Sequence, residues 1–341
     1  MPRMLPDGRR LGAHLPLGHG MVKAVDRAHA IGATAMQVFA DNPTAWQRRA
    51  NPPREAPAFR ERLTELDIGP VAIHAAYLVN LAGPEPAFWT QSVAVLASDL
   101  LAAPTFAARF VNVHIGSHRG TGVDAGVERV ADGLALVLAQ VAATSAAGAP
   151  LAMVVLENSP GSGFGLGTNV DELAAIATAI AARDIAPGRV GFCLDAAHAW
   201  AAGIELSDHG ATDTFLTEFD ERIGLERLVM LHLNDSRSEL GSRLDRHEHL
   251  GAGRIGVVGL RHLLTHPSLA HVTYILETPG MDDGYDAINV ARAYDIAAGR
   301  PLADLPPGAG ELTSDRSRTG PPAEEPEEPE VDGLVAADFA E

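Results

Sequence analysis

Six side chains able to bind a metal ion or to move a proton stand at the ends of six successive apolar segments. They are His74, His114, Glu157, Asp195, His232 and Glu277. Carboxylates that are buried close together repel each other unless cations neutralise them. Imidazole and carboxylate ligands together favour Zn²⁺, with Mn²⁺ or Fe²⁺ as alternatives, over Mg²⁺ and Ca²⁺, which prefer oxygen ligands. If the six segment ends converge, the sequence predicts a metal site.

Three further candidates follow from spacing. In "LDAAHAW", His198 comes three residues after Asp195, which is about one helical turn if a helix begins there. In "GSRLDRHEHL", Asp245, His247 and His249 alternate, so all three share one side of an extended chain. Asp245, His247 and His198 would form a compact set. The resulting nine candidate ligands exceed what one ion takes, but they suffice for three ions if one carboxylate bridges.

These positions belong to a recurring unit, in which a short aliphatic run precedes a longer segment rich in Ala and Leu. Runs without polar alternation are typical of strands buried on both faces of a parallel sheet, and segments such as 132–150 and 170–184 favour helices. Eight such units predict a (β/α)₈ TIM barrel, whose strands end on the face where barrel enzymes place their chemistry. A doubly wound open sheet is the alternative. The expected strands are 10–15, 35–40, 71–75, 109–115, 151–158, 189–195, 228–234 and 272–278.

Composition indicates a large aliphatic core, since 46% of the 341 residues are hydrophobic and 5% are aromatic. No apolar run approaches the roughly 20 residues of a membrane helix, and the first residues lack the apolar segment of a signal peptide. The single cysteine, Cys193, cannot form an intramolecular disulfide and is expected to be an inert thiol inside a strand. We therefore expect a cytoplasmic protein that does not engage a membrane. We also expect it to be a monomer.

The net charge of −18 argues at first sight against binding to the phosphates of nucleic acid. The charge is uneven, because eleven acidic residues and two arginines between Pro301 and Glu341 account for half of it. This segment, with "PPAEEPEEPE" at its centre, is typical of a disordered acidic tail. We expect an N-terminal extension at 1–10, one barrel domain at 11–298 and an acidic Pro- and Glu-rich tail at 299–341.

Six motifs occur in a characteristic order: "IHAAYLVNLA", "VNVHIGSH", "VLENSPGSGFGLGT", "VGFCLDAAHAWAAGIEL", "LHLNDSRSELGSRLDRHEHLGAGRIG" and "ILET". Together they resemble the endonuclease IV family (deoxyribonuclease IV, apurinic/apyrimidinic endonuclease) over roughly residues 11–298. The resemblance implies a (β/α)₈ barrel with three zinc ions, Mn²⁺ being an alternative at one site. It also implies hydrolysis of double-stranded DNA 5′ to abasic sites, which leaves a 3′-hydroxyl and a 5′-deoxyribose phosphate.

The resemblance also implies a role for each candidate. His74, His114 and Glu157 would hold the first zinc ion, and Glu157 would bridge to a second ion held by Asp195, His232 and Glu277. His198, Asp245 and His247 would hold the third ion, whereas His249 matches no ligand position. Glu157 and Glu277 are the expected catalytic residues, with Glu277 orienting the nucleophile.

DNA contacts are expected from the loops that follow the second and third strands. Tyr77 and Leu78 match positions that enter the duplex at the lesion, where an apolar wedge would compensate for lost stacking. Asn42 and Trp46 match the loop after the second strand. Thr44 stands where better-known members carry a basic side chain, which leaves open how this loop enters DNA.

Two other functions fit a barrel of this kind. A sugar isomerase or epimerase of the xylose-isomerase-like group shares the fold and a strand-end metal site, but its ligands are mostly carboxylates. The histidine-rich set, above all His198, Asp245 and His247, disfavours that reading. An inactive barrel kept as a DNA- or protein-binding module is disfavoured because all nine candidate ligands are present.

Overall fold

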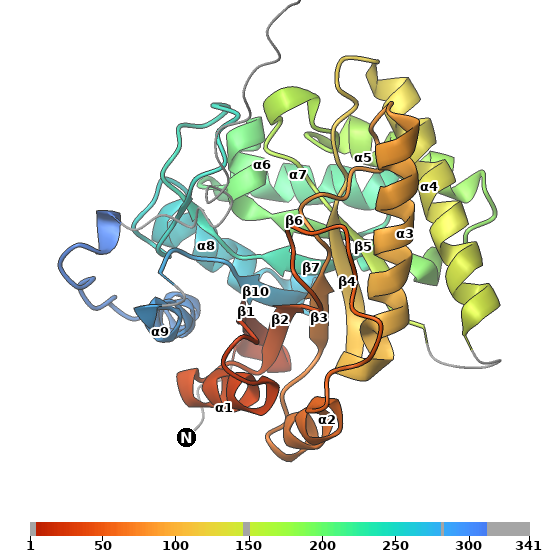
Figure 1. Ribbon diagram of the computed structural model, residues 1–341. Helices are drawn as coiled ribbons and strands as arrows, with labels where there is room; N and C mark the ends of the chain where they lie inside the picture. Colours follow the sequence, from red (N-terminus) through yellow and green to blue (C-terminus); the bar gives the residue numbers. More distant parts are fainter. Residues whose placement is uncertain (1–4, 146–150, 281–282, 312–341) are drawn as a thin grey trace, which may run out of the picture.

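The barrel is built from eight parallel strands, which the helices surround (Figure 1). The computed structural model describes residues 5–145, 151–280 and 283–311. The ring closes where β1 pairs with β10, with Ala13 opposite Leu276. Closure excludes the doubly wound open sheet and confirms the predicted (β/α)₈ fold. The strands are β1 (Leu11–His14), β2 (Ala35–Phe39), β3 (Val71–His74), β4 (Ala108–His114), β5 (Met153–Glu157), β6 (Val190–Asp195), β7 (Leu228–His232) and β10 (Thr273–Leu276).

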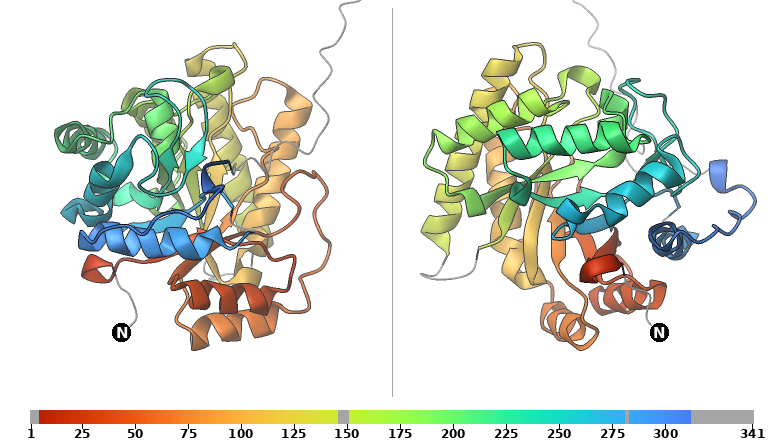
Figure 2. Two further views of the ribbon diagram at one scale, coloured as in Figure 1. Left: turned by 90° about the vertical axis from the view of Figure 1, so that its left-hand side faces the viewer. Right: turned by 180° about the vertical axis from the view of Figure 1, so that it is seen from behind.

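Helices cover the outside of the barrel, as the views from two further sides show (Figure 2). The predicted helix at 170–184 corresponds to α5, and that at 132–150 overlaps α4, its residues 146–150 lying outside the described part of the chain. No helix in the described ranges combines the length and apolarity needed to cross a bilayer. The helices are α1 (Met21–Ile31), α2 (Ala56–Glu65), α3 (Pro86–Ala102), α4 (Val123–Thr144), α5 (Val170–Ala181), α6 (Ala196–Ala202), α7 (His209–Arg222), α8 (Gly256–Thr265) and α9 (Tyr285–Ala298).

The strands are buried on both faces, so the core has two layers. A large layer lies between the barrel and its helices, and a small one with Phe110, Met230 and Ile275 fills the barrel interior. Cys193 belongs to the interior layer, and burial raises the pKa of its thiol to about 11. The thiol is therefore protonated at neutral pH, as expected for an inert core cysteine.

Segments before and after the barrel contact it. Arg9 is buried and donates hydrogen bonds to the carbonyls of Leu264 (2.7 Å) and His266 (2.9 Å), at the end of the barrel where the strands begin. After α9, Ala303 accepts a hydrogen bond from Arg292 (2.6 Å), and Ala309 is buried. The described part of the segment assigned to the tail therefore lies against the barrel, and 312–341 lies outside the described residues.

A long excursion between β7 and α8 carries a two-residue antiparallel hairpin, β8 (Asp235–Ser236) with β9 (His247–Glu248). The buried carboxylate of Asp235 fixes the end of this excursion. It accepts hydrogen bonds from the backbone N–H groups of Gly251 (2.9 Å), Gly253 (3.0 Å) and Ile255 (3.0 Å). A Cβ at Gly253 would lie 2.5 Å from Asp235 Oδ1, so only glycine allows this approach. The hairpin is thereby held over the C-terminal ends of the strands.

Candidate metal centre

Glu157 lies at the centre of the cluster at the C-terminal ends of the strands. Its carboxylate is fully buried, and Oε2 lies 3.4 Å from His74 Nε2 and 3.5 Å from His114 Nε2. The other oxygen, Oε1, lies 3.3 Å from His198 Nδ1 and 3.4 Å from His232 Nδ1. The two oxygens therefore face two separate pairs of imidazoles. A carboxylate placed in this way can bridge two cations.

Strand register explains why these side chains meet. His114 lies opposite Glu157 in the β4–β5 ladder, and Asp195 lies opposite His232 in the β6–β7 ladder. Neighbours in register on parallel strands point to the same side of the sheet. Glu277 follows β10 directly, so it joins the same end of the barrel.

A third group forms between α6 and the hairpin. Asp195 caps α6 and accepts a hydrogen bond from the backbone N–H of His198 (2.8 Å), which fixes the first turn of this helix. The imidazole of His198 then faces the hairpin, with Nε2 3.2 Å from Asp245 Oδ2. The other carboxylate oxygen of Asp245 lies 3.1 Å from His247 Nε2. The structure thus brings together all three residues that sequence spacing combines.

His249 stands outside the cluster. Its Nδ1 lies 3.0 Å from the side-chain nitrogen of Asn289, its Nε2 lies 3.2 Å from the carbonyl oxygen of Ala309, and its ring stacks on Tyr285. The extended segment ends at Glu248, so the alternation that places three side chains on one side does not continue to this residue. His249 instead fastens the hairpin to α9 and to the segment after it.

The candidate ligands fall into overlapping groups whose donor atoms lie within 4.8 Å of one another. The groups are His74, His114 and Glu157; Glu157, Asp195, His232 and Glu277; and Asp195, His198 and His247, with Asp245 in contact with the two histidines of the third group. Glu157 Oε1, His232 Nδ1 and His247 Nε2 are buried and form no hydrogen bond, although each lies at ion-pair distance from a neighbouring group. Such atoms are costly unless a ligand satisfies them. The donor set therefore fits divalent metal ions that take mixed nitrogen and oxygen ligands.

Without bound ions, charge pairing controls the protonation of the cluster. Burial alone would raise the pKa of Glu157, but the imidazoles of His114 and His232 outweigh it and hold this pKa well below its usual range. Burial would lower the pKa of His247, but Asp245 raises it to about 9. Glu157 is therefore ionised at neutral pH, whereas His247 must release a proton to serve as a metal ligand.

Four buried amide side chains, to which no sequence pattern assigns a role, hold the acidic residues in place through their carboxylates or their backbone. Asn112 donates to Glu157 Oε2 (2.5 Å), and Asn234 donates to Asp195 Oδ2 (2.7 Å). The carbonyl oxygen of the Asn158 side chain accepts from the backbone N–H of Asp195 (2.6 Å). The fourth amide, Gln37, donates to Glu277 Oε1 (2.6 Å), which also lies 3.0 Å from Nδ1 of His14. For Gln37 and Asn112, a polar residue inside an otherwise apolar run is the sequence signal, whereas Asn158 and Asn234 come just after the ends of β5 and β7.

Three of the four expected DNA-contacting residues line a hollow of about 530 Å³ beside the metal cluster. Tyr77 and Leu78 line it together with Trp46, and its wall also includes Glu157 and Asp245. Tyr77 is 41% exposed, and the centroid of its ring lies 5.7 Å from that of the His74 ring. An exposed ring next to a buried ligand candidate is well placed to meet a nucleic acid whose backbone reaches the cluster.

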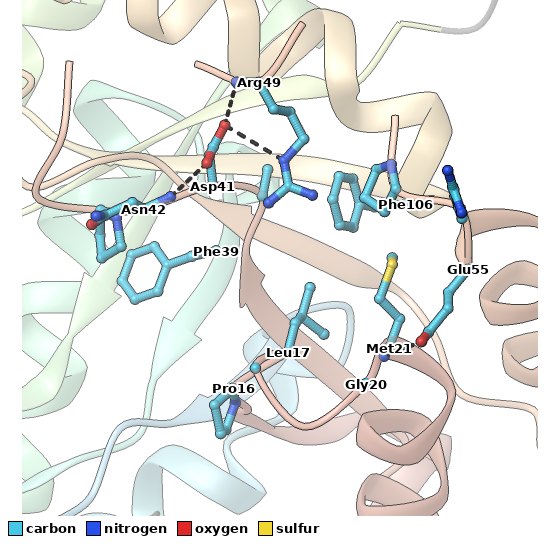
Figure 3. A pocket seen from close by; sticks show the side chains of 15 residues that line it. Pro16, Leu17, Gly20, Met21, Phe39, Asp41, Asn42, Arg49, Glu55 and Phe106 are labelled. Carbon is cyan, nitrogen blue, oxygen red and sulfur yellow. Dashed lines mark hydrogen bonds and ion pairs between the residues drawn. The ribbon is translucent and has the colours of Figure 1, made fainter. Parts of the chain in front are cut away.

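Asn42, the fourth expected DNA contact, lines a neighbouring hollow of about 650 Å³ between the β1–α1 and β2–α2 loops (Figure 3). The side-chain oxygen of Asn42 accepts a hydrogen bond from the hydroxyl of Thr44 (2.9 Å), so both side chains are engaged within the loop. Asp41 accepts from the backbone N–H groups of Asn42 (2.9 Å) and Arg49 (2.6 Å), as Figure 3 shows. Two of the three arginines of this loop, Arg49 and Arg54, line this hollow, whereas position 44 carries no basic side chain.

Comparison with known proteins agrees with this geometry. Residues 25–298 match the model of the xylose isomerase-like TIM barrel family. "Probable endonuclease 4" of Methanoculleus marisnigri is 39% identical over 84% of this chain and 98% of its own length, and that of Chloroflexus aurantiacus is 36% identical over 85% and 99%. The chain therefore belongs to the endonuclease IV family of xylose isomerase-like barrels, as the motifs indicate.

Solved structures give the same picture. Endonuclease IV from Thermus thermophilus superimposes with a TM-score of 0.72 at 37% identity, covering 85% of this chain and 99% of that chain. A D-tagatose 3-epimerase-like protein superimposes with a TM-score of 0.59 over 85% of this chain and 96% of that chain, but at only 15% identity. The second likeness concerns the barrel alone.

Proposed function

We propose that this protein is a zinc-dependent DNA repair endonuclease that hydrolyses the phosphodiester 5′ to an abasic site. The products would be a 3′-hydroxyl and a 5′-deoxyribose phosphate. The observation that carries the proposal is the placement of Glu157, whose two oxygens face different pairs of imidazoles within a set of nine donors. The names of the relatives, endonuclease 4 and endonuclease IV, support a nuclease.

Three zinc ions would be held by the three groups of donors. The first set is His74, His114 and Glu157, the second is Glu157, Asp195, His232 and Glu277, and the third is His198, Asp245 and His247. When bound, zinc would stabilise negative charge on the phosphate oxygens and would lower the pKa of a water ligand to near neutrality. Glu157, as the shared carboxylate, sets the spacing between the first two sets.

Glu277 is the residue that would orient the attacking water. One of its oxygens is held by Gln37 and His14, and its backbone N–H donates to the side-chain oxygen of Asn234 (2.8 Å). The other oxygen, Oε2, lies 3.4 Å from His232 Nδ1. Fixing one oxygen in this way leaves the second to face the cluster in a defined direction, which is the requirement for positioning a nucleophile.

Recognition of the lesion would come from Tyr77, Leu78 and Trp46, which line the hollow beside the cluster. An abasic nucleotide has no base to stack, so it costs less to move out of the duplex than an intact one. An aromatic or apolar side chain inserted at the gap would replace part of the lost stacking. In this proposal the loops recognise the abasic site, and the residues at the strand ends carry out the hydrolysis.

The test is incision of an end-labelled duplex with one abasic-site analogue, using protein of measured metal content. We expect cleavage 5′ to the analogue and a 3′ end that a DNA polymerase extends. Glu157→Gln should lose both incision and part of its metal. A fully metallated protein that leaves the duplex intact would refute the proposal. Turnover of a ketose by the same preparation would instead support a sugar epimerase.

A further inference from the structure

A second cluster of metal-binding side chains lies on the outside of the barrel, between α7 and α8. Asp213 belongs to α7, His262 belongs to α8, and His266 follows α8 directly. One donor atom from each lies within 4.8 Å of the others. None of the three residues belongs to the strand-end cluster described above. Two imidazoles and a carboxylate are a ligand combination typical of Zn²⁺.

Helix geometry produces this cluster. His262 and His266 are four residues apart and so share one face, as do His209 and Asp213 on the neighbouring helix. The two helices lie side by side (Figure 2, right). A Cβ at Gly259 would lie only 2.1 Å from the carbonyl oxygen of residue 206, just before α7, so the glycine permits this close approach.

One pair of donor atoms has the spacing of ligands in a metal site, and the other pair forms a hydrogen bond. His262 Nε2 lies 2.5 Å from Asp213 Oδ1, and His266 Nε2 lies 3.3 Å from the same oxygen. Ligands placed tetrahedrally around Zn²⁺ at 2.0–2.1 Å are separated from each other by about 3.3 Å. For all three to share one ion, His262 must release its hydrogen bond to Asp213 and move slightly away from that oxygen.

Burial restricts the two imidazoles and leaves an entry path. The side chains of His262 and His266 are 17% and 15% exposed, whereas that of Asp213 is 53% exposed. The ring of His209 stacks on that of His262, with centroids 4.1 Å apart and planes at 15°. Ring contacts with the exposed His209 and between His262 and His266 therefore restrain the imidazoles, and an ion can reach them from the side of the exposed carboxylate.

The cluster is also remote from the strand-end centre. The carbonyl of His266 accepts a hydrogen bond from Arg9, which precedes β1 and lies at the end of the barrel where the strands begin. The strand-end centre lies at the opposite end, where the strands finish. Binding at one cluster therefore requires no ligand from the other.

We propose that Asp213, His262 and His266 bind one divalent transition-metal ion of the zinc class, with water as the remaining ligand. The ion ties α7 to α8 on the outer surface of the barrel. Because it binds the folded state and not the unfolded chain, it stabilises the protein by mass action. Its role is structural, and the strand-end cluster does not depend on it.

The experiment uses the full chain with its tightly bound metal retained, and Zn²⁺ alone as the probe. Zinc binding is measured by titration calorimetry, and the thermal midpoint is measured with and without added zinc. We expect His262→Ala/His266→Ala to bind one zinc equivalent less than the native protein. Added zinc at about tenfold above the dissociation constant should raise the native midpoint by roughly 2–4 °C but leave that of the variant unchanged.

Two further variants keep the test decisive. The control His29→Ala/His271→Ala removes two exposed histidines outside the cluster. It should bind as many zinc equivalents as the native protein. Asp213→Asn keeps the shape of the side chain but loses its charge, and should lose the site even if the double variant folds poorly. Equal zinc uptake and equal midpoint shifts in the native protein and Asp213→Asn would overturn the proposal. Incision of abasic duplex should be unchanged in Asp213→Asn.

Discussion

Asn112 donates a hydrogen bond of 2.5 Å to Oε2 of Glu157, the oxygen that faces His74 and His114. Both residues are fully buried, and Asn112 lies on β4 two positions before His114. The amide thus fixes the carboxylate in the orientation that lets its other oxygen face a different pair of imidazoles. Amides in this position tune a metal centre although they bind no metal themselves.

Replacing Asn112 by Ala should therefore weaken the centre without removing a ligand. We expect metal affinity or incision rate to fall by about 10–100-fold, the range typical of such outer partners. Metal content after dialysis and incision rate at several zinc concentrations measure the two effects. Asn51→Ala, at an exposed position, is the control. Full metal retention together with full activity in Asn112→Ala would show that Glu157 needs no such support.

Asp99 makes the stability of the protein depend on pH. It is buried in α3, and burial raises the pKa of its carboxyl to about 7. A carboxyl whose pKa is higher in the folded state than in the unfolded chain stabilises folding most at low pH, and this contribution is lost as pH rises from about 4 through 7. The loss is at most about 4 kcal/mol.

Asp99→Asn should accordingly flatten this dependence. At pH 8 we expect the variant to unfold at a higher temperature than the native protein, and at pH 5 the difference should be small or reversed. Thermal unfolding at fixed zinc concentration across pH 5–8 measures this, because the contribution of the metal centre cancels between the two proteins. If the two midpoints run parallel across the range, Asp99 does not carry the effect.

Much of the fold can be predicted from the sequence because the buried strands of a parallel barrel are predominantly apolar runs. The end of such a run is also where a polar side chain is tolerated, so Glu157 and Asp195 stand out by position. Parallel register then brings together residues that are far apart in sequence, such as His114 and Glu157. The apolar runs, together with the rule that parallel barrel strands all end on one face, are sufficient to predict this part of the site.

The remaining features depend on tertiary contacts that no local pattern contains. Asn112 and Gln37 look like isolated polar residues inside strands until their partners on other strands are known. The alternation of 245–249 predicts one common face, but the hairpin ends at Glu248 and His249 turns toward α9. The cluster of Asp213 with His262 requires two outer helices to lie side by side, which spacing along one helix cannot reveal.

Tyr77 should contribute to recognition of the lesion rather than to the chemical step. Its ring is exposed and lines the hollow beside the cluster, so Ala at this position removes a stacking surface. Stacking of an aromatic ring on a base is worth about 1–3 kcal/mol, which corresponds to roughly 5–150-fold in affinity. We expect KM for abasic duplex to rise within that range while kcat changes little. Steady-state incision kinetics separate the two.

Leu136 offers a matched control for Tyr77, because it is an exposed apolar side chain on the outer face of α4. Leu136→Ala should leave both constants unchanged. A fall in kcat without a change in KM for Tyr77→Ala would place this ring in the chemistry, contrary to the prediction. Binding to intact duplex should change less than binding to abasic duplex, since an intact base stack leaves no gap for the ring.

The uneven charge of the chain should govern its affinity for undamaged DNA. Residues 312–341 carry nine acidic residues and two arginines, and the barrel is itself acidic, so phosphates are attracted only near bound metal ions and basic loops such as that of Arg49. Removing 312–341 should therefore tighten binding to intact duplex by roughly 2–5-fold at low salt. This gain in affinity should shrink above 0.15 M salt, where charges are screened beyond about 8 Å.

Fluorescence anisotropy across a salt series measures the affinity for intact duplex and its salt dependence. A variant of 312–341 with neutral residues in place of the acidic ones separates the effect of charge from that of the length of the segment. Equal affinities of the truncated and full-length chains at low salt would contradict the prediction.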